Sequence, residues 1–174
     1  MTLYKAQVRP IMEYAPLTWM SSARCHLNLL DKVQRRAERL IAARQSHPPI
    51  PPDHQPWRQR QHVTHEEGSV LKDTLEHRRR VAALTVLHKA QISHVPHLAD
   101  LRATWRRSDR NTRTVLNNNL LLEVPRSRSS THQRTFSSAT VVWWNNLTAV
   151  VDVRPMTTQQ MKVTTHRWLL LHPP

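Results

Sequence analysis

Residues 81–87 have the sequence VAALTVL, in which threonine is the one polar residue. They lie within residues 69–92, a stretch that contains no proline and is followed by Pro96, so it predicts one helix. Because apolar side chains surround residues 81–87 on nearly every side, this helix should lie at the centre of a bundle rather than on its rim. The stretch therefore predicts an all-α fold, a small helical bundle.

Residues 27–41 predict a second helix, because apolar residues follow helical spacing on an arc of about 140°. Ser21 or Ser22 is expected to cap its start. Four cations fall on a separate arc of about 100°. These four residues are called the basic face: Lys32, Arg35, Arg36 and Arg39. One side of this helix should therefore pack, and another should be cationic.

Glycine and proline usage favours helices over hairpins. The chain has one glycine, Gly68, and 12 prolines, whereas tight hairpin turns usually need glycine or Asn-Gly. Further helices are predicted at residues 3–14, 136–147 and 156–171. In the first of these, Pro10 is expected to kink the helix or begin its second half, and Pro16 to end it.

Two loops complete the predicted organisation. Residues 47–56, HPPIPPDHQP, are expected to be a Pro-rich linker. Residues 102–130 are rich in Arg and Asn and are expected to be a mobile basic loop, with a short strand or turn at 120–124. The predicted parts are a helical bundle (1–98), a basic flexible region (99–135) and a looser C-terminal helical extension (136–174).

Charge is the clearest feature of the composition. Lys and Arg total 26 and Asp and Glu total 12, so the formal net charge is +14. Such a chain attracts polyanions, and nucleic acid is the usual partner. A membrane partner is not expected, because no apolar run approaches the roughly 20 residues that span a bilayer. The start of the chain lacks a signal-peptide pattern, so a nuclear or cytoplasmic location is expected.

The sequence predicts no metal site, no cofactor and no catalytic activity of this chain alone. Cys25 is the only cysteine, and a zinc site needs four ligands or three plus water. Two histidine pairs, 62/65 and 94/97, have ligand-like spacing, but solvated histidines explain them better. The acidic residues show no paired spacing of the kind that holds two metal ions for phosphoryl transfer.

The aromatic residues are assigned mainly to the core. Phe136 and Trp144 are expected to anchor it, because they lie at i and i+8 on one helix face and large aromatics are mostly buried. Trp105, beside Arg106 and Arg107, is the better candidate for stacking on bases.

Four segments together cover most of the chain up to residue 147. They are residues 3–19 (LYKAQVRPIMEYAPLTW), 29–41 (LLDKVQRRAERLI), 75–90 (LEHRRRVAALTVLHKA) and 134–147 (RTFSSATVVWWNNL). In this order they resemble the region after the palm domain in jockey- and CR1-like non-LTR retrotransposon reverse transcriptases, which are RNA-directed DNA polymerases. The chain departs from the family pattern at two positions. It has His88 where the family has a tyrosine, and Thr148 where the family has a proline.

The resemblance implies a thumb-like bundle that grips an RNA/DNA template–primer duplex by its phosphates beside an upstream palm. The palm's Tyr-x-Asp-Asp element is absent, so the chain is expected to bind nucleic acid rather than copy it. The candidate contacts are the basic face together with Arg78, Arg79, Arg80, Arg106 and Arg107. The alternatives are a solvated helix face, a truncated or decayed gene product without independent activity, and a Pro-rich interaction protein.

Overall fold

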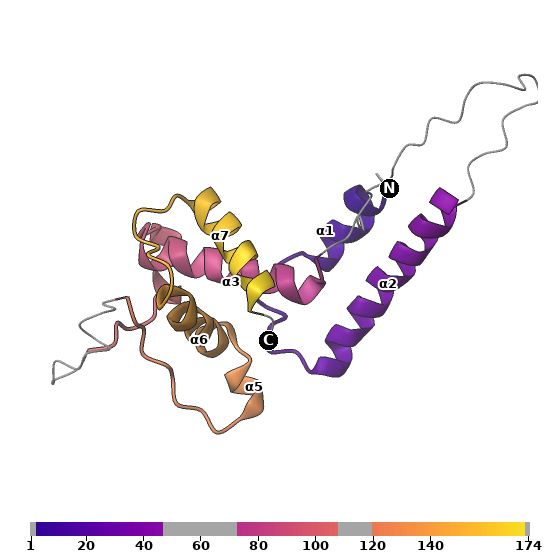
Figure 1. Ribbon diagram of the computed structural model, residues 1–174. Coiled ribbons are helices and arrows are strands. Elements are labelled where there is room, and N and C mark those ends of the chain that lie inside the picture. The colour runs from indigo at the N-terminus through magenta and orange to yellow at the C-terminus, as the bar shows by residue number, and fades with distance from the viewer. Residues whose placement is uncertain (1–2, 47–72, 108–119, 173–174) are drawn as a thin grey trace, which may run out of the picture.

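The structure is a computed structural model, and it describes residues 3–46, 73–107 and 120–172. Its elements are the π-helix η1 (Tyr4–Val8), α1 (Arg9–Met12), α2 (Arg24–Ser46), α3 (Leu75–Gln91), the 3₁₀ helix η2 (Pro96–Leu101), α5 (Ser130–Gln133), α6 (Phe136–Thr148) and α7 (Thr158–Leu171). Within the described residues the only β-pairing is an isolated bridge between Trp105 and Leu122. The prediction of an all-α fold is confirmed (Figure 1).

Helix α3 is the centre of the fold, as its sequence predicts. Thr74 caps its start, with Oγ1 accepting a hydrogen bond from the His77 N–H at 3.1 Å. Apolar side chains on more than one side of the helix are buried, among them Val81, Leu84 and Leu87. The predicted start at residue 69 lies outside the described residues.

The main core forms where α6 and α7 pack on α3 (Figure 1). Its buried members are Leu84, Leu87, Leu120, Leu122, Val141, Trp144, Leu147, Val153 and Met161. Trp144 is fully buried, and its indole Nε1–H donates to the Leu120 carbonyl at 2.8 Å. Phe136 packs against the same core, so both predicted anchors contact it.

The C-terminal part, predicted as a looser helical extension, contributes to the main core. Helices α6 and α7 supply much of the main core, and Leu120 and Leu122 fill it from within the stretch predicted as a mobile basic loop. The physical reason is that residues 81–87 of α3 are apolar nearly all round, so one neighbouring helix cannot cover them. The main core therefore contains residues from all three predicted parts of the chain, whose boundaries lie near residues 98 and 135. Residues 108–119 of the predicted basic loop lie outside the described residues.

The N-terminal elements form a second, smaller cluster against the start of α3. Tyr4, Met12 and Leu75 are its buried members. Pro10 lies in the first turn of α1, directly after the π-helix η1, where the Arg9 N–H donates to the Tyr4 carbonyl five residues earlier. Proline lacks an N–H and its ring crowds the preceding turn, and the wider turn accommodates it. Pro10 thus begins the second half of this helical segment, one of the two predicted outcomes.

Helix α2 packs on the small cluster through a narrower face than its periodicity predicts. Leu30, Ala37 and Ile41 pack there, but Val33 and Leu40 are 47% and 64% exposed. The first intrahelical bonds run to the Ala23 carbonyl, from the N–H groups of residues 26 and 27. The helix therefore starts after Ala23, and not at the predicted serine cap.

The two leucines Leu147 and Leu171 give a matched test of the main core, because the first is fully buried and the second is 78% exposed. Leu147→Ala should lower the free energy of unfolding by about 2–5 kcal/mol, through lost burial and the cavity left behind. Leu171→Ala should change it by less than about 0.5 kcal/mol. Urea unfolding measures both, and equal effects would contradict the assigned core.

His88 is a buried polar member of α3 whose ring Nε2–H donates to the Val153 carbonyl at 3.1 Å. Burial lowers the pKa of His88 below its ordinary value of 6.5, and the bond to Val153 offsets this in part. The unfolded chain therefore binds a proton there at higher pH than the folded chain. The free energy of unfolding should consequently fall as the pH drops below about 6.5.

His88→Gln should weaken this pH dependence, because glutamine keeps a hydrogen-bond donor but does not titrate. Urea unfolding at about pH 7.5 and about pH 5.5 measures the difference. His94→Gln is the matched control, since His94 is exposed. An unchanged pH dependence in His88→Gln would show that His88 is not the group responsible.

Candidate nucleic-acid interface

The basic face lies on the outer side of α2, opposite the side that packs on the small cluster. All four of its side chains are exposed. Arg35 Nε donates to the Asp31 carbonyl at 3.3 Å, and Arg39 Nε to the Arg35 carbonyl at 3.4 Å. Among the described residues, no carboxylate forms an ion pair with any of the four.

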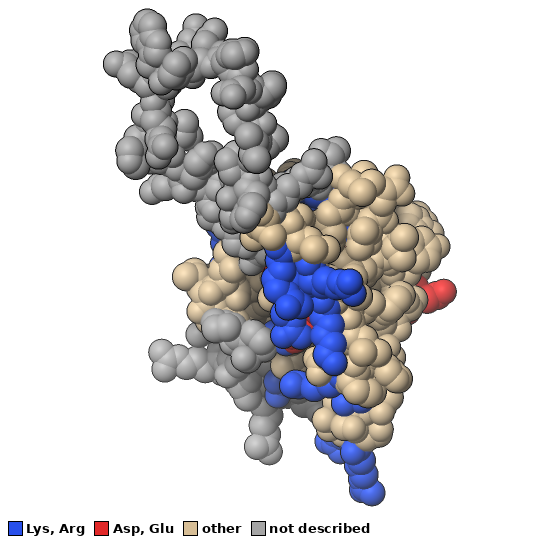
Figure 2. Space-filling view, turned by 90° about the vertical axis from the view of Figure 1, so that its right-hand side faces the viewer, with Lys and Arg blue, Asp and Glu red and all other residues tan. Residues whose placement is uncertain are grey.

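Figure 2 views the molecule from the side on which α2 lies in Figure 1 and shows Lys and Arg side chains gathered there. The two carboxylates of α2 face elsewhere. Glu38 accepts a hydrogen bond from Gln34 Nε2 at 3.0 Å, and Gln34 is buried against the start of α3. Asp31 lines a cavity that Arg79 also borders. This arrangement leaves the guanidinium groups of the basic face available to a polyanion.

The arginine triplet Arg78–Arg80 is held inside the protein instead. Arg78 forms an ion pair with Glu13. Arg79 is 9% exposed, and burial lowers the pKa of its guanidinium while Asp31 and Glu76 raise it. These contacts leave little of either side chain for an external phosphate.

Arg80 has two internal partners. Its Nη2 donates to Glu76 at 2.6 Å, and its guanidinium carbon lies 4.9 Å from the centre of the Trp143 ring. All three arginines of the triplet therefore interact with acidic side chains within the protein, whereas no described carboxylate forms an ion pair with the basic face.

Arg106 and Arg107 are exposed and follow the bridge between Trp105 and Leu122. Trp105 packs against the main core, so its role as a stacking platform is not supported. The Pro-rich stretch 47–56 and the histidine pair at 62 and 65 lie outside the described residues. His94 and His97 are both exposed.

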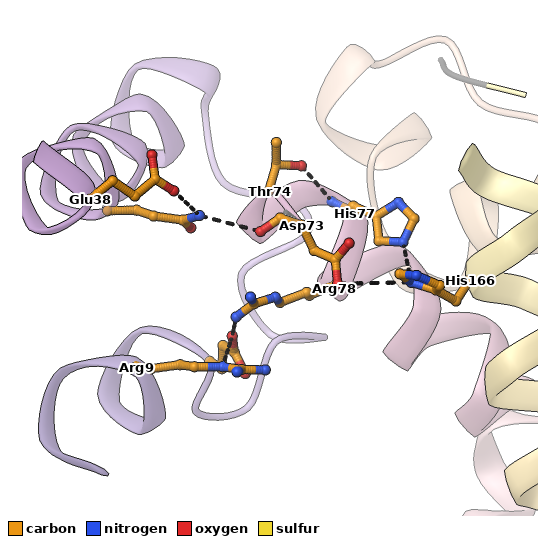
Figure 3. A network of polar contacts seen from close by, with 9 residues as sticks. Arg9, Glu38, Asp73, Thr74, His77, Arg78 and His166 are labelled. Carbon is orange, nitrogen blue, oxygen red and sulfur yellow. Dashed lines mark hydrogen bonds and ion pairs between the residues drawn. The ribbon is translucent and has the colours of Figure 1, made fainter. Parts of the chain in front are cut away.

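A network of polar contacts fixes α1 and α2 against α3 (Figure 3). Glu13 binds Arg9 at 2.8 Å and also Arg78, which joins α1 to α3. Gln34 Nε2 donates to the Asp73 carbonyl at 3.2 Å, which joins α2 to the start of α3. Since Gln34 lies on the packed side of α2, this bond helps to turn the basic face outward.

The same network brings together two histidines that are distant in sequence. His77 Nε2 lies 2.8 Å from His166 Nδ1, and Asp73 Oδ2 lies 3.9 Å from the same nitrogen. His77 follows Asp73 by four residues, but no neighbouring residue in the sequence of either histidine points to the other histidine. Spacing along the sequence could not find it, because 89 residues separate the two histidines.

No protein-family model, curated protein or solved structure matches this chain. No described helix combines the length and apolar character that a membrane span requires.

Glu13→Gln tests the link between α1 and α3. The Arg78 side chain is only 15% exposed. Replacing the Glu13 carboxylate therefore leaves the mostly buried guanidinium of Arg78 without the negative charge that pairs with it. The free energy of unfolding should fall by about 1–3 kcal/mol in urea denaturation. Glu123→Gln changes the net charge equally at an exposed site and should have almost no effect. Equal losses would mean that charge alone is responsible.

Proposed function

We propose that this protein is a non-catalytic nucleic-acid-binding module that holds a duplex by its phosphate backbone through the basic face of α2. One observation carries the proposal. Four cations lie exposed on one side of one helix, and no described carboxylate pairs with them, while the opposite side is packed.

The geometry of the basic face suits phosphates. Cations four residues apart, such as Lys32 and Arg36 or Arg35 and Arg39, are about 6 Å apart along the helix axis, so each can meet a separate phosphate. Guanidinium groups bind phosphate oxygens with two parallel hydrogen bonds. Contacts of this kind position a duplex and carry little sequence information, and we therefore expect non-specific binding.

The resemblance to the post-palm region of non-LTR reverse transcriptases supports a more specific form of the proposal. The segment with the most distinctive match, residues 29–41, is the one that carries the basic face. In this form the chain is thumb-like and grips an RNA/DNA template–primer duplex beside the palm of an RNA-directed DNA polymerase, in the nucleus or cytoplasm.

A second candidate is a truncated or decayed gene product without independent activity. It is favoured by exposed apolar side chains on α2, where Leu29, Val33 and Leu40 are 57%, 47% and 64% exposed. In this interpretation, these side chains would pack against a polymerase domain of the parent element. A chain of this kind should unfold gradually on heating, and a sharp thermal transition of the isolated protein would count against it.

Charge reversal on the basic face tests the proposal. In the variant Arg35→Glu, Arg36→Glu and Arg39→Glu, affinity for a random-sequence duplex should fall by at least about a hundredfold, because each lost phosphate contact removes counterion release. For the wild type, the plot of log affinity against log salt should have a slope of about −3.6 for four contacts. Fluorescence anisotropy across a salt series measures both.

The matched control reverses three exposed arginines that are not part of α2, namely Arg126, Arg128 and Arg167. Both triple variants lower the net charge by six, so long-range attraction weakens equally in each. The control should retain most of the affinity. If the two variants lose the same affinity, the basic face has no special role and only net charge matters.

A further inference from the structure

Three side chains of metal-binding types meet where the start of α3 crosses α7. Asp73 and His77 are four residues apart at the start of α3, and His166 comes from the middle of α7. One ligand atom from each lies within 4.8 Å of the others. Figure 3 shows the three side chains directed toward one another. We call them the Asp-His-His cluster.

The donor set has a defined chemistry. Two imidazole nitrogens and one carboxylate oxygen suit a divalent transition metal such as zinc, whereas magnesium prefers oxygen ligands alone. In a tetrahedral zinc site with bonds of about 2.0–2.1 Å, neighbouring ligand atoms lie about 3.3 Å apart. The observed distances of 2.8 Å between the histidines and 3.9 Å between Asp73 and His166 lie on either side of that value.

We propose that Asp73, His77 and His166 form a binding site for a zinc-class divalent ion, which joins α7 to the start of α3. With three protein ligands, the fourth coordination position belongs to water, as in open zinc sites. The cluster borders a cavity of about 650 Å³, which provides both room for that water and a path for the ion.

The charges around the cluster permit a cation despite the basic character of the chain. Arg78 and Arg80 act on His77 electrostatically, but each is paired with a glutamate, Glu13 and Glu76 respectively.

The competing interpretation is a simple hydrogen bond between the two histidine rings. In that case one ring nitrogen carries the proton that the other accepts. A metal ion would displace this proton, because each coordinating nitrogen must offer its lone pair. The two interpretations differ in whether zinc stabilises the fold through these side chains.

The position of the cluster gives the ion a structural effect. Asp73 also binds α2, because its carbonyl accepts from Gln34. An ion on the Asp73 carboxylate would therefore hold α7, the start of α3 and the contact to α2 in one arrangement. Since the ion binds the folded chain, it should raise the stability of the protein by mass action.

The test uses the full-length chain without an affinity tag, stripped of metal by a chelator and titrated with zinc chloride. Calorimetry should show one tight site per chain. Zinc at about a hundred times the dissociation constant should raise the thermal midpoint by about 5–10 °C. Magnesium chloride should give no such shift.

Variants identify the ligands. His166→Gln and Asp73→Asn should each weaken zinc binding by at least about tenfold and remove most of the thermal shift. The control His94→Gln with His97→Gln changes two exposed histidines of the same chain and should bind zinc as the wild type does. Asp73→Asn keeps the shape of the side chain, so it remains informative if His166→Gln fails to fold.

Three results would overturn the proposal. The first is a wild-type chain whose thermal midpoint zinc does not raise. The second is an Asp73→Asn variant, folded without metal, that binds zinc as tightly as the wild type. The third is loss of the tight site in the control variant, which would assign it to the exposed histidines.

Discussion

The covering of α3 is the constraint on which the rest of the structure depends. A helical stretch that is apolar nearly all round, as residues 81–87 are, cannot lie at a surface, and here α6 and α7 pack on this part of α3. The N-terminal elements cover its start through Leu75. The contacts between helices at the candidate sites depend on this arrangement, because Asp73 lies just before α3, and His77 and Arg78 lie in its first turn, beside these neighbours.

Much of the helical content could be predicted from the sequence, because it depends on local pattern. The central role of residues 81–87 and the bounds of α6 followed from apolar spacing and proline positions. The partners of α3 could not be predicted in this way. Residues 120–122 are flanked by Arg- and Asn-rich sequence that resembles a loop, and only the tertiary fold places Leu120 and Leu122 under Trp144.

The two candidate sites also differ in how far the sequence could predict them. The basic face follows from the period of one helix, and its exposure agrees with that period. The internal partners of Arg78 could not be foreseen, because Glu13 lies 65 residues away. The Asp-His-His cluster depends on the crossing of two helices from distant parts of the chain. Sequence spacing can predict which face of a helix is charged, but not whether a charge has found a partner elsewhere in the fold.

The division of the apolar residues into two clusters has a consequence for dynamics. Helix α2 is held by the smaller cluster and by a few polar bonds, while the main core contains none of its residues. Elements with few buried contacts open at lower free energy than the core, in separate cooperative units. The amide hydrogens of α2 should thus exchange with solvent through a subglobal opening that leaves α3, α6 and α7 intact. The helix that carries the basic face would then be more adaptable than the helices of the main core.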